Sequence, residues 1–106
     1  MQDISLYFRA LADRKRVDIL VYLARHNQVA VSELGEELHM SQPLISWHLR
    51  KLRRAGVVKT HRAGRQVLCS LNRPVMARYQ ARVEAMFGLD AATDQQAASL
   101  QPAANS

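Results

Sequence analysis

One stretch decides the fold of this chain: SQPLISWHLRKLRRAG, residues 41–56. Ser41 is a good N-cap because its hydroxyl accepts hydrogen bonds from early backbone N–H groups, and Pro43 lies in the first turn, where its missing N–H costs no hydrogen bond. Gly56 suits the end of a helix. Between them, apolar residues recur at helical spacing and form a core-facing stripe: Ile45, Leu49 and Leu52.

A short helix and a tight turn precede this segment. Val31 to Leu38 has the pattern of a short helix that Ser32 can cap, and His39-Met40 joins it to Ser41. Two short helices joined by a tight turn are typical of helix-turn-helix motifs, whose second helix lies in the major groove of DNA.

After Gly56 the periodicity changes. Val57 to His61 is rich in β-branched residues, Ala63-Gly64 marks a turn, and Gln66 to Leu71 returns as a second short strand. These strands predict a hairpin, or wing, whose tip carries Arg62 and Arg65.

Helices complete the predicted domain at both ends. The apolar spacing favours helices from Ile4 to Leu11 and from near Asp13 to about Arg25, and Pro74 begins a last helix that Gly88 stops. The predicted order is four helices, a two-stranded hairpin and one helix. This order makes a mainly α protein with a small β-hairpin, a winged helix-turn-helix.

Length and composition agree with this prediction. The 106 residues suit one domain. We expect it over residues 1–89, with a disordered tail over 90–106 that is too polar to offset its ordering entropy. The start of the chain lacks the layout of a secretory signal, no apolar run could span a membrane, and Cys69 is the single cysteine. A cytoplasmic protein is therefore expected.

The net charge of +6 is unevenly distributed. No acidic residue occurs between Glu37 and Glu84. Ten basic residues lie in that stretch: Arg50, Lys51, Arg53, Arg54, Lys59, Arg62, Arg65, Arg73, Arg78 and Arg82. Such a field favours a polyanion, either nucleic acid or an anionic membrane surface, although a merely solvated basic face is the alternative.

The helix that Ser41 opens carries side chains suited to reading bases. Gln42 can pair with adenine, Ser46 can donate or accept, and Arg50 can pair with guanine or a phosphate. Trp47 has two interpretations: it packs against thymine methyls or a sugar, or it folds back over the motif. The set expected to contact double-stranded DNA is Ser41, Gln42, Ser46, Trp47, His48, Arg50, Lys51, Arg54, Arg62 and Arg65.

With these motifs the chain resembles the ArsR/SmtB family of bacterial winged-helix repressors over roughly residues 4 to 87. The run SQPLISWHL at 41–49 is the most specific match. Other matching stretches are Ala10-Leu11-Ala12-Asp13 with Arg16 and Ile19-Leu20, Ser32-Glu33-Leu34, Leu52 with Ala55-Gly56-Val57-Val58, and Arg62-Ala63-Gly64-Arg65. The resemblance implies a homodimer that binds operator DNA near a promoter and releases it when an effector binds.

The apolar faces of the first and last helices also point to a dimer. They exceed what a small core needs, so contact with a second copy would bury them, although the alternative is that both helices simply close the monomer core. The expected interface residues are Ile4, Tyr7, Phe8, Leu11, Val75, Tyr79, Val83, Met86 and Phe87.

The metal sites that the resemblance suggests are not matched. Ala30 and Ser32 occupy the positions of the arsenic-binding cysteines, and the positions of the zinc ligands on the last helix hold Arg73, Val75, Met86 and Leu89. Cys69 and the four histidines lack ligand-like spacing, and Cys69 is expected to be a buried small hydrophobe. We expect neither a metal nor a cofactor, while a small-molecule or protein effector stays open.

The sequence offers no sign of an enzyme, since it contains no Gly-rich phosphate loop, nucleophile elbow or paired-carboxylate cleft. We therefore expect a sequence-specific, dimeric transcriptional repressor. Two alternatives stay open: a winged-helix protein-interaction module, and a metal- or redox-responsive repressor that uses a site with no sequence signature.

Overall fold

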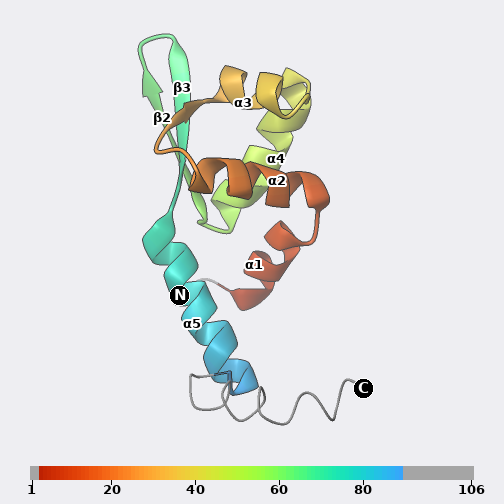
Figure 1. Ribbon diagram of the computed structural model, residues 1–106, viewed down its shortest axis with the longest axis vertical. Coiled ribbons are helices and arrows are strands. Elements are labelled where there is room, and N and C mark those ends of the chain that lie inside the picture. The colour runs from red at the N-terminus through yellow and green to blue at the C-terminus, as the bar shows by residue number, and fades with distance from the viewer. Residues whose placement is uncertain (1–2, 90–106) are drawn as a thin grey trace. The chain divides into compact units, whose positions relative to one another are not determined.

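The computed structural model describes residues 3–89, so the tail expected over 90–106 lies outside the described residues. The elements are α1 (Ile4–Leu11), α2 (Arg14–Ala24), β1 (Val29–Ala30), α3 (Val31–Glu37), α4 (Gln42–Arg54), β2 (Val58–Ala63), β3 (Gln66–Leu71) and α5 (Arg73–Phe87) (Figure 1). The chain divides into two compact units after Met76, inside α5. The first unit holds α1 to α4 and the sheet.

The predicted winged helix-turn-helix is confirmed, with one strand added. β2 and β3 form the antiparallel hairpin in register from Val58↔Leu71 to Ala63↔Gln66. β1 pairs with the other edge of β3, so the sheet has the order β1-β3-β2. The hairpin closes through a two-residue turn in which Gly64 has a φ of 64°, a left-handed conformation that favours glycine.

Side-chain caps start four of the helices. Asp3 accepts from the backbone of Ser5, Asp13 from those of Lys15 and Arg16, and Ser41 from that of Leu44. At α5 the side chain of Asn72 accepts from the backbone N–H of Val75 at 3.4 Å. The cap predicted for α3 is wrong. Ala30 is its N-cap residue without a side-chain hydrogen bond, and Ser32 lies inside the helix, because the chain enters α3 directly from β1.

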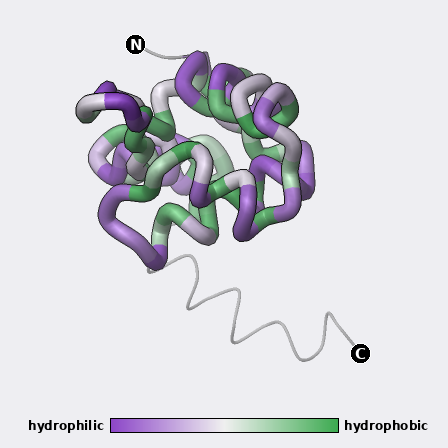
Figure 2. The backbone as a smooth tube through the Cα atoms, turned by 90° about the horizontal axis from the view of Figure 1, so that it is seen from above, coloured by the Kyte–Doolittle hydropathy of each residue, from purple (hydrophilic) through white to green (hydrophobic). Residues whose placement is uncertain are grey.

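The stripe predicted on α4 forms the centre of the core. Ile45, Leu49 and Leu52 are buried, as are Leu34 of α3 and Ile19 of α2. Both α2 and α3 contact α4. Figure 2 shows hydrophobic and hydrophilic stretches alternating along the backbone. Burying one such side chain contributes about 1.5–3 kcal/mol, so this packing holds α4 in place.

Arg16 ties the N-terminal helices to α4. Its Nε donates to the carbonyl oxygen of Ala10 at 3.0 Å and its Nη2 to that of Arg9 at 3.0 Å, so it caps the last carbonyls of α1. Its Nη1 lies 3.3 Å from Nδ1 of His48 on α4. Because a guanidinium only donates, Nδ1 accepts and the proton of a neutral His48 sits on Nε2.

The burial of His48 corrects the expectation that it contacts DNA. Its side chain is 2% exposed and faces the interior beside the core stripe. Its Nε2 has no hydrogen-bond partner among the described residues. Burial lowers the pKa of His48 below its ordinary 6.5, the charges of Arg16 and Lys15 lower it further, and Asp13 opposes this shift.

One tyrosine of the predicted dimer interface lies in the core of the first unit. Tyr7 is 5% exposed in the single chain. A side chain that is already buried offers little surface to a second copy. Phe8, Met86 and Phe87 of the same set are exposed.

The buried His48 predicts a pH dependence of stability. Since the unfolded chain takes up this proton more readily, the contribution of neutral His48 is complete above its ordinary pKa and is lost as the pH falls through the lowered folded value. In His48→Asn, whose amide oxygen can still accept from Arg16, the free energy of unfolding should fall less between about pH 7 and about pH 5. The slope of the free energy of unfolding against pH should differ between wild type and His48→Asn by at most about 1.4 kcal/mol per pH unit. Urea unfolding followed by circular dichroism measures it.

The matched control is His39→Asn, which removes an exposed imidazole from a left-handed position (φ 56°) that asparagine tolerates. The change in slope should be larger in His48→Asn than in this variant. Identical slopes for wild type and His48→Asn would contradict the interior position of His48.

Cys69 predicts an unreactive thiol. Its side chain is 0% exposed, its Sγ donates to the carbonyl oxygen of Val29 at 3.2 Å, and burial raises its pKa from 9.0 to about 11. Because the thiolate is the reactive form, a disulfide reagent at about pH 8 should label folded protein at least ~100-fold more slowly than protein in urea. As the single cysteine, Cys69 accounts for the whole signal. Equal rates in the two states would exclude this burial.

Candidate nucleic-acid interface

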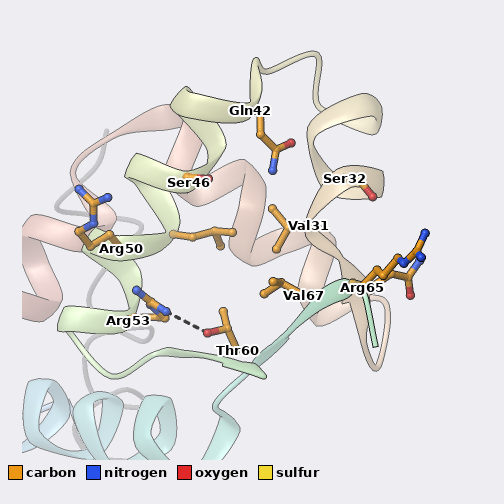
Figure 3. A pocket seen from close by; sticks show the side chains of 11 residues that line it. Val31, Ser32, Gln42, Ser46, Arg50, Arg53, Thr60, Arg65 and Val67 are labelled. Atoms are coloured by element: carbon orange, nitrogen blue, oxygen red, sulfur yellow. Dashed lines mark hydrogen bonds between the residues drawn. The ribbon is translucent and has the colours of Figure 1, made fainter. Parts of the chain in front are cut away.

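Three polar side chains form one row along the exposed face of α4. Gln42, Ser46 and Arg50 follow one another at intervals of four residues, which places them on the same face, and all three are exposed. Figure 3 shows them arising from successive turns of α4. The burial of the opposite stripe leaves this row free to meet a ligand.

A hollow of about 330 Å³ lies beside this row, between α4, α3 and the hairpin. Its lining residues are Val31, Ser32, Gln42, Ser46, Leu49, Arg50, Arg53, Thr60, Arg65, Gln66 and Val67 (Figure 3). The lining combines apolar side chains with amides, hydroxyls and guanidinium groups. These polar groups suit the phosphates and base edges of a nucleic acid.

A hydrogen bond sets the hairpin against α4. Arg53 Nη1 donates to Oγ1 of Thr60 on β2 at 3.0 Å, as the dashed line in Figure 3 marks. This bond joins the last turn of α4 to the first half of β2 and so helps to fix the angle between helix and wing. Sequence reasoning missed both residues, although Arg53 follows Arg50 by three positions and shares its side of the helix.

The tip of the wing is basic and exposed. Arg62 lies in β2, one residue before the strand ends, and Arg65 lies in the turn that follows. Both side chains are exposed. Neither they nor Arg50 form an ion pair with another residue in the part of the chain that the structure describes. Their charge is therefore available to an anionic partner.

Trp47 lies on the flank of α4, next to the row. Its side chain is 45% exposed, with Lys51 Nζ 5.0 Å and Arg16 Cζ 5.9 Å from the ring centroid. Such distances allow cation–π attraction. The indole is thus partly exposed, as a contact with DNA would require, and partly covered by Arg16 and Lys51. Each of the two interpretations of Trp47, contact with DNA or packing over the motif, therefore describes part of its surroundings.

The remaining predicted residues lie around the same helix. The hydroxyl of Ser41 accepts from Leu44 N at 3.3 Å and remains exposed at the start of α4. Lys51 is half-buried, and Arg54 is exposed in the last turn. Apart from the buried His48, the predicted set lies on α4 or on the tip of the wing.

Two other kinds of feature are absent from residues 3–89. That range contains no group of three or more His, Cys, Asp or Glu side chains placed to hold a metal ion. None of its helices is long and apolar enough to cross a membrane.

Comparison with known proteins identifies the family. The family model described as bacterial regulatory protein, arsR family, matches residues 13–60, from the cap of α2 to β2. The HTH-type transcriptional repressor SmtB of Mycobacterium tuberculosis is 49% identical over 63 residues, 59% of this chain and 46% of that protein. The transcriptional repressor SdpR of Bacillus subtilis is 35% identical over 69 residues, 65% of this chain and 76% of that protein.

A solved structure extends the match to the fold. The ArsR-like transcriptional regulator from Rhodococcus sp. RHA1 superposes with a TM-score of 0.71 at 28% identity, covering 97% of this chain and 93% of that one. The chain spans about half the length of several named relatives, SmtB among them. Motif, fold and relatives agree, and the chain belongs to the ArsR family of bacterial regulatory proteins.

Proposed function

We propose that this protein is a transcriptional repressor that binds operator DNA as a homodimer, with α4 in the major groove. One observation carries the proposal: Gln42, Ser46 and Arg50 stand in an exposed row on a helix whose opposite stripe is buried. SmtB and SdpR are both named as repressors, which supports repression rather than activation. Repression is then steric, because the bound dimer covers a promoter.

The row on α4 supplies the base contacts in this proposal. An amide such as that of Gln42 can pair with the N6 and N7 edge of adenine, and a guanidinium such as that of Arg50 with O6 and N7 of guanine. The hydroxyl of Ser46 can donate or accept. Gln42 and Ser46 lie in the first half of α4, the part of such a helix that contacts base edges.

The wing supplies contacts to the DNA backbone. Arg62 and Arg65 are exposed at the end of a hairpin that Arg53 and Thr60 join to α4. A basic loop in that position can grip phosphates or enter the minor groove. Such contacts position the protein on the duplex, whereas the row on α4 selects the sequence.

The dimer is proposed to form through α1 and α5. Three large apolar side chains of these helices are exposed in the single chain: Phe8 by 42%, Met86 by 53% and Phe87 by 60%. The half-buried members of the expected set are Ile4, Leu11, Val75 and Val83. Two copies of α4 related by twofold symmetry would address half-sites about 34 Å apart. A protein whose partner is operator DNA acts in the cytoplasm. Its effector would be an organic molecule or a protein.

Substitution of Gln42 tests base reading. Gln42→Ala should bind the best duplex obtained by selection from random sequences about 5- to 150-fold more weakly, because a bidentate contact contributes about 1–3 kcal/mol of discrimination. It should also lose the preference for one base pair in each half-site. Fluorescence anisotropy on the selected duplex and its single-base variants measures both effects.

The matched control is Gln28→Ala, since Gln28 is exposed in the loop between α2 and β1. This variant should bind every duplex as the wild type does. If Gln42→Ala weakened all duplexes equally, its amide would not read a base. Failure of the wild type to bind any duplex at low salt would overturn the proposed function as a whole.

Substitution of Phe87 tests the dimer. A charge placed on the proposed interface should shift Phe87→Glu to a monomer at micromolar concentration in sedimentation velocity and weaken operator binding at least ~10-fold, since the half-sites are then bound singly. Val21→Glu is the control because Val21 is a 43% exposed apolar residue of α2 outside the proposed interface. A monomeric wild type, or a dimeric Phe87→Glu, would contradict this interface.

A further inference from the structure

A second basic surface lies on the flank of α4, between α1 and the last two turns of α4. It is a small cleft of about 90 Å³. Its lining residues are Leu6, Arg9, Ala10, Arg16, Lys51 and Arg54. Four of these six carry a positive charge, and they come from three different helices. We refer to it as the α1–α4 cleft.

The cleft belongs to a different sector of α4 from the hollow beside the wing. At 3.6 residues per turn, each residue is rotated about 100° from the one before it, so Lys51 lies about 100° around the helix from Arg50. Trp47 lies between these two directions and borders the cleft, because Lys51 and Arg16 both approach its ring. The hollow and the cleft therefore occupy the two flanks of one exposed helix.

The cations of the cleft are only partly compensated. Arg9, Lys51 and Arg54 form no ion pair with any described residue. The carboxylate of Asp13 interacts electrostatically with Arg16 while it caps α2 through the backbone of Lys15 and Arg16. Lys51 and Arg54 lie in the last turns of α4 and Arg9 in the last turn of α1, where the helix dipole favours a cation, and Arg16 caps α1. The two helix ends and Arg16 nevertheless place four cations around one cleft. Like charges gathered in this way favour a bound anion.

The geometry of DNA suggests which anion it is. A helix is about 10–12 Å across with its side chains, and the major groove is about 12 Å wide, so both flanks of an inserted helix face a phosphate strand. The hollow and the wing serve one flank of α4. The α1–α4 cleft is the cationic feature of the other flank. Guanidinium groups match the oxygens of a phosphate in pairs, which suits a cleft lined by three arginines.

We propose that the α1–α4 cleft binds a phosphate group of the DNA strand on the side of α4 remote from the wing. This inference rests on the proposed function, and it extends the DNA contact surface to α1 through Arg9. The cleft contributes affinity and register without reading bases. Arg16 keeps two of its five N–H groups after its bonds to α1 and His48, so it can hold the phosphate while it holds α4.

The test uses Arg9→Ala and Arg54→Ala, two exposed residues of the cleft on different helices. Each variant should bind the selected duplex about tenfold more weakly at low salt, as expected for the loss of a charge-assisted hydrogen bond. The slope of log K against log salt should become less steep by about 0.9 for a lost phosphate contact. The ranking of single-base duplex variants should stay that of the wild type.

The matched control is Arg25→Ala, which removes one exposed arginine from the far end of α2 and thus the same charge. It should keep the wild-type salt slope. If Arg9→Ala and Arg54→Ala keep that slope as well, or behave as Arg25→Ala does, the proposal is wrong. Circular dichroism of each variant verifies that the fold is retained.

A second measurement separates this inference from the proposed function. Trp47 is the single tryptophan of the chain, so its emission reports on the border of the cleft. Inorganic phosphate added to wild-type protein without DNA should change this emission saturably, and the change should be lost in both cleft variants but not in Arg25→Ala. A change that is linear, or equal in all variants, would overturn the cleft as a phosphate site even if the protein binds DNA.

The remaining combination assigns the source of the phosphate. If inorganic phosphate binds in the cleft but the salt slopes for DNA are unchanged in the cleft variants, the ligand is a free phosphate compound, and the DNA contact proposed here is wrong. If the wild type binds no duplex, the proposed function and the DNA contact fail together, and the phosphate titration alone decides whether the cleft is an anion site.

Discussion

Burial of the stripe Ile45, Leu49 and Leu52 fixes the rotation of α4 about its own axis, and every property proposed for this helix depends on that rotation. Because successive residues are offset by about 100°, the same register that turns the stripe inward turns Gln42 and Arg50 outward. A rotation by one residue would bury polar side chains and expose the core. The cost of such an exchange, about 1.5–3 kcal/mol for each apolar side chain, holds the exposed faces in their present positions.

Arg16 adds a polar constraint to this apolar one. The stripe fixes rotation, whereas the guanidinium joins the last carbonyls of α1 to His48 on α4 and so relates the position of α4 to that of α1. Bonds of this kind are directional, unlike the hydrophobic contacts of the core. Arg16 thus adds a directional link between α4 and the helix proposed to meet a second copy, beside the direct contact of α1 with α4. A repressor must hold two such helices at a defined spacing, which gives this bridge a functional as well as a structural consequence.

Much of this structure could be predicted from the sequence, and each error has a physical reason. The pattern in residues 41–56 placed α4, its cap and its stripe, and the β-branched run after Gly56 placed the hairpin. β1 was missed because a strand of two residues is too short to show an alternating pattern. The cap of α3 was misplaced because, without β1, the sequence did not show that the chain enters α3 directly from a strand. The burial of His48 had a signal, since it lies three residues after Ile45 and four before Leu52, but its polarity argued for the surface. The sequence could not predict which apolar side chains of α1 are buried within the monomer and which remain for a dimer contact. Both the core and a dimer interface require an apolar face, so the pattern is the same for each.

The position of His48 on α4 also explains why Arg16 is paired with a histidine that is neutral rather than charged. A charged side chain at position 48 would add a cation to the flank where four already converge, and it would have to lose its hydration, because the side chain is buried. Neutral imidazole accepts from Arg16 without adding charge. The guanidinium can then keep its remaining N–H groups for an anion outside. The interior of the protein thus stays neutral at this position, while the positive field is concentrated on the surface that would meet the polyanion.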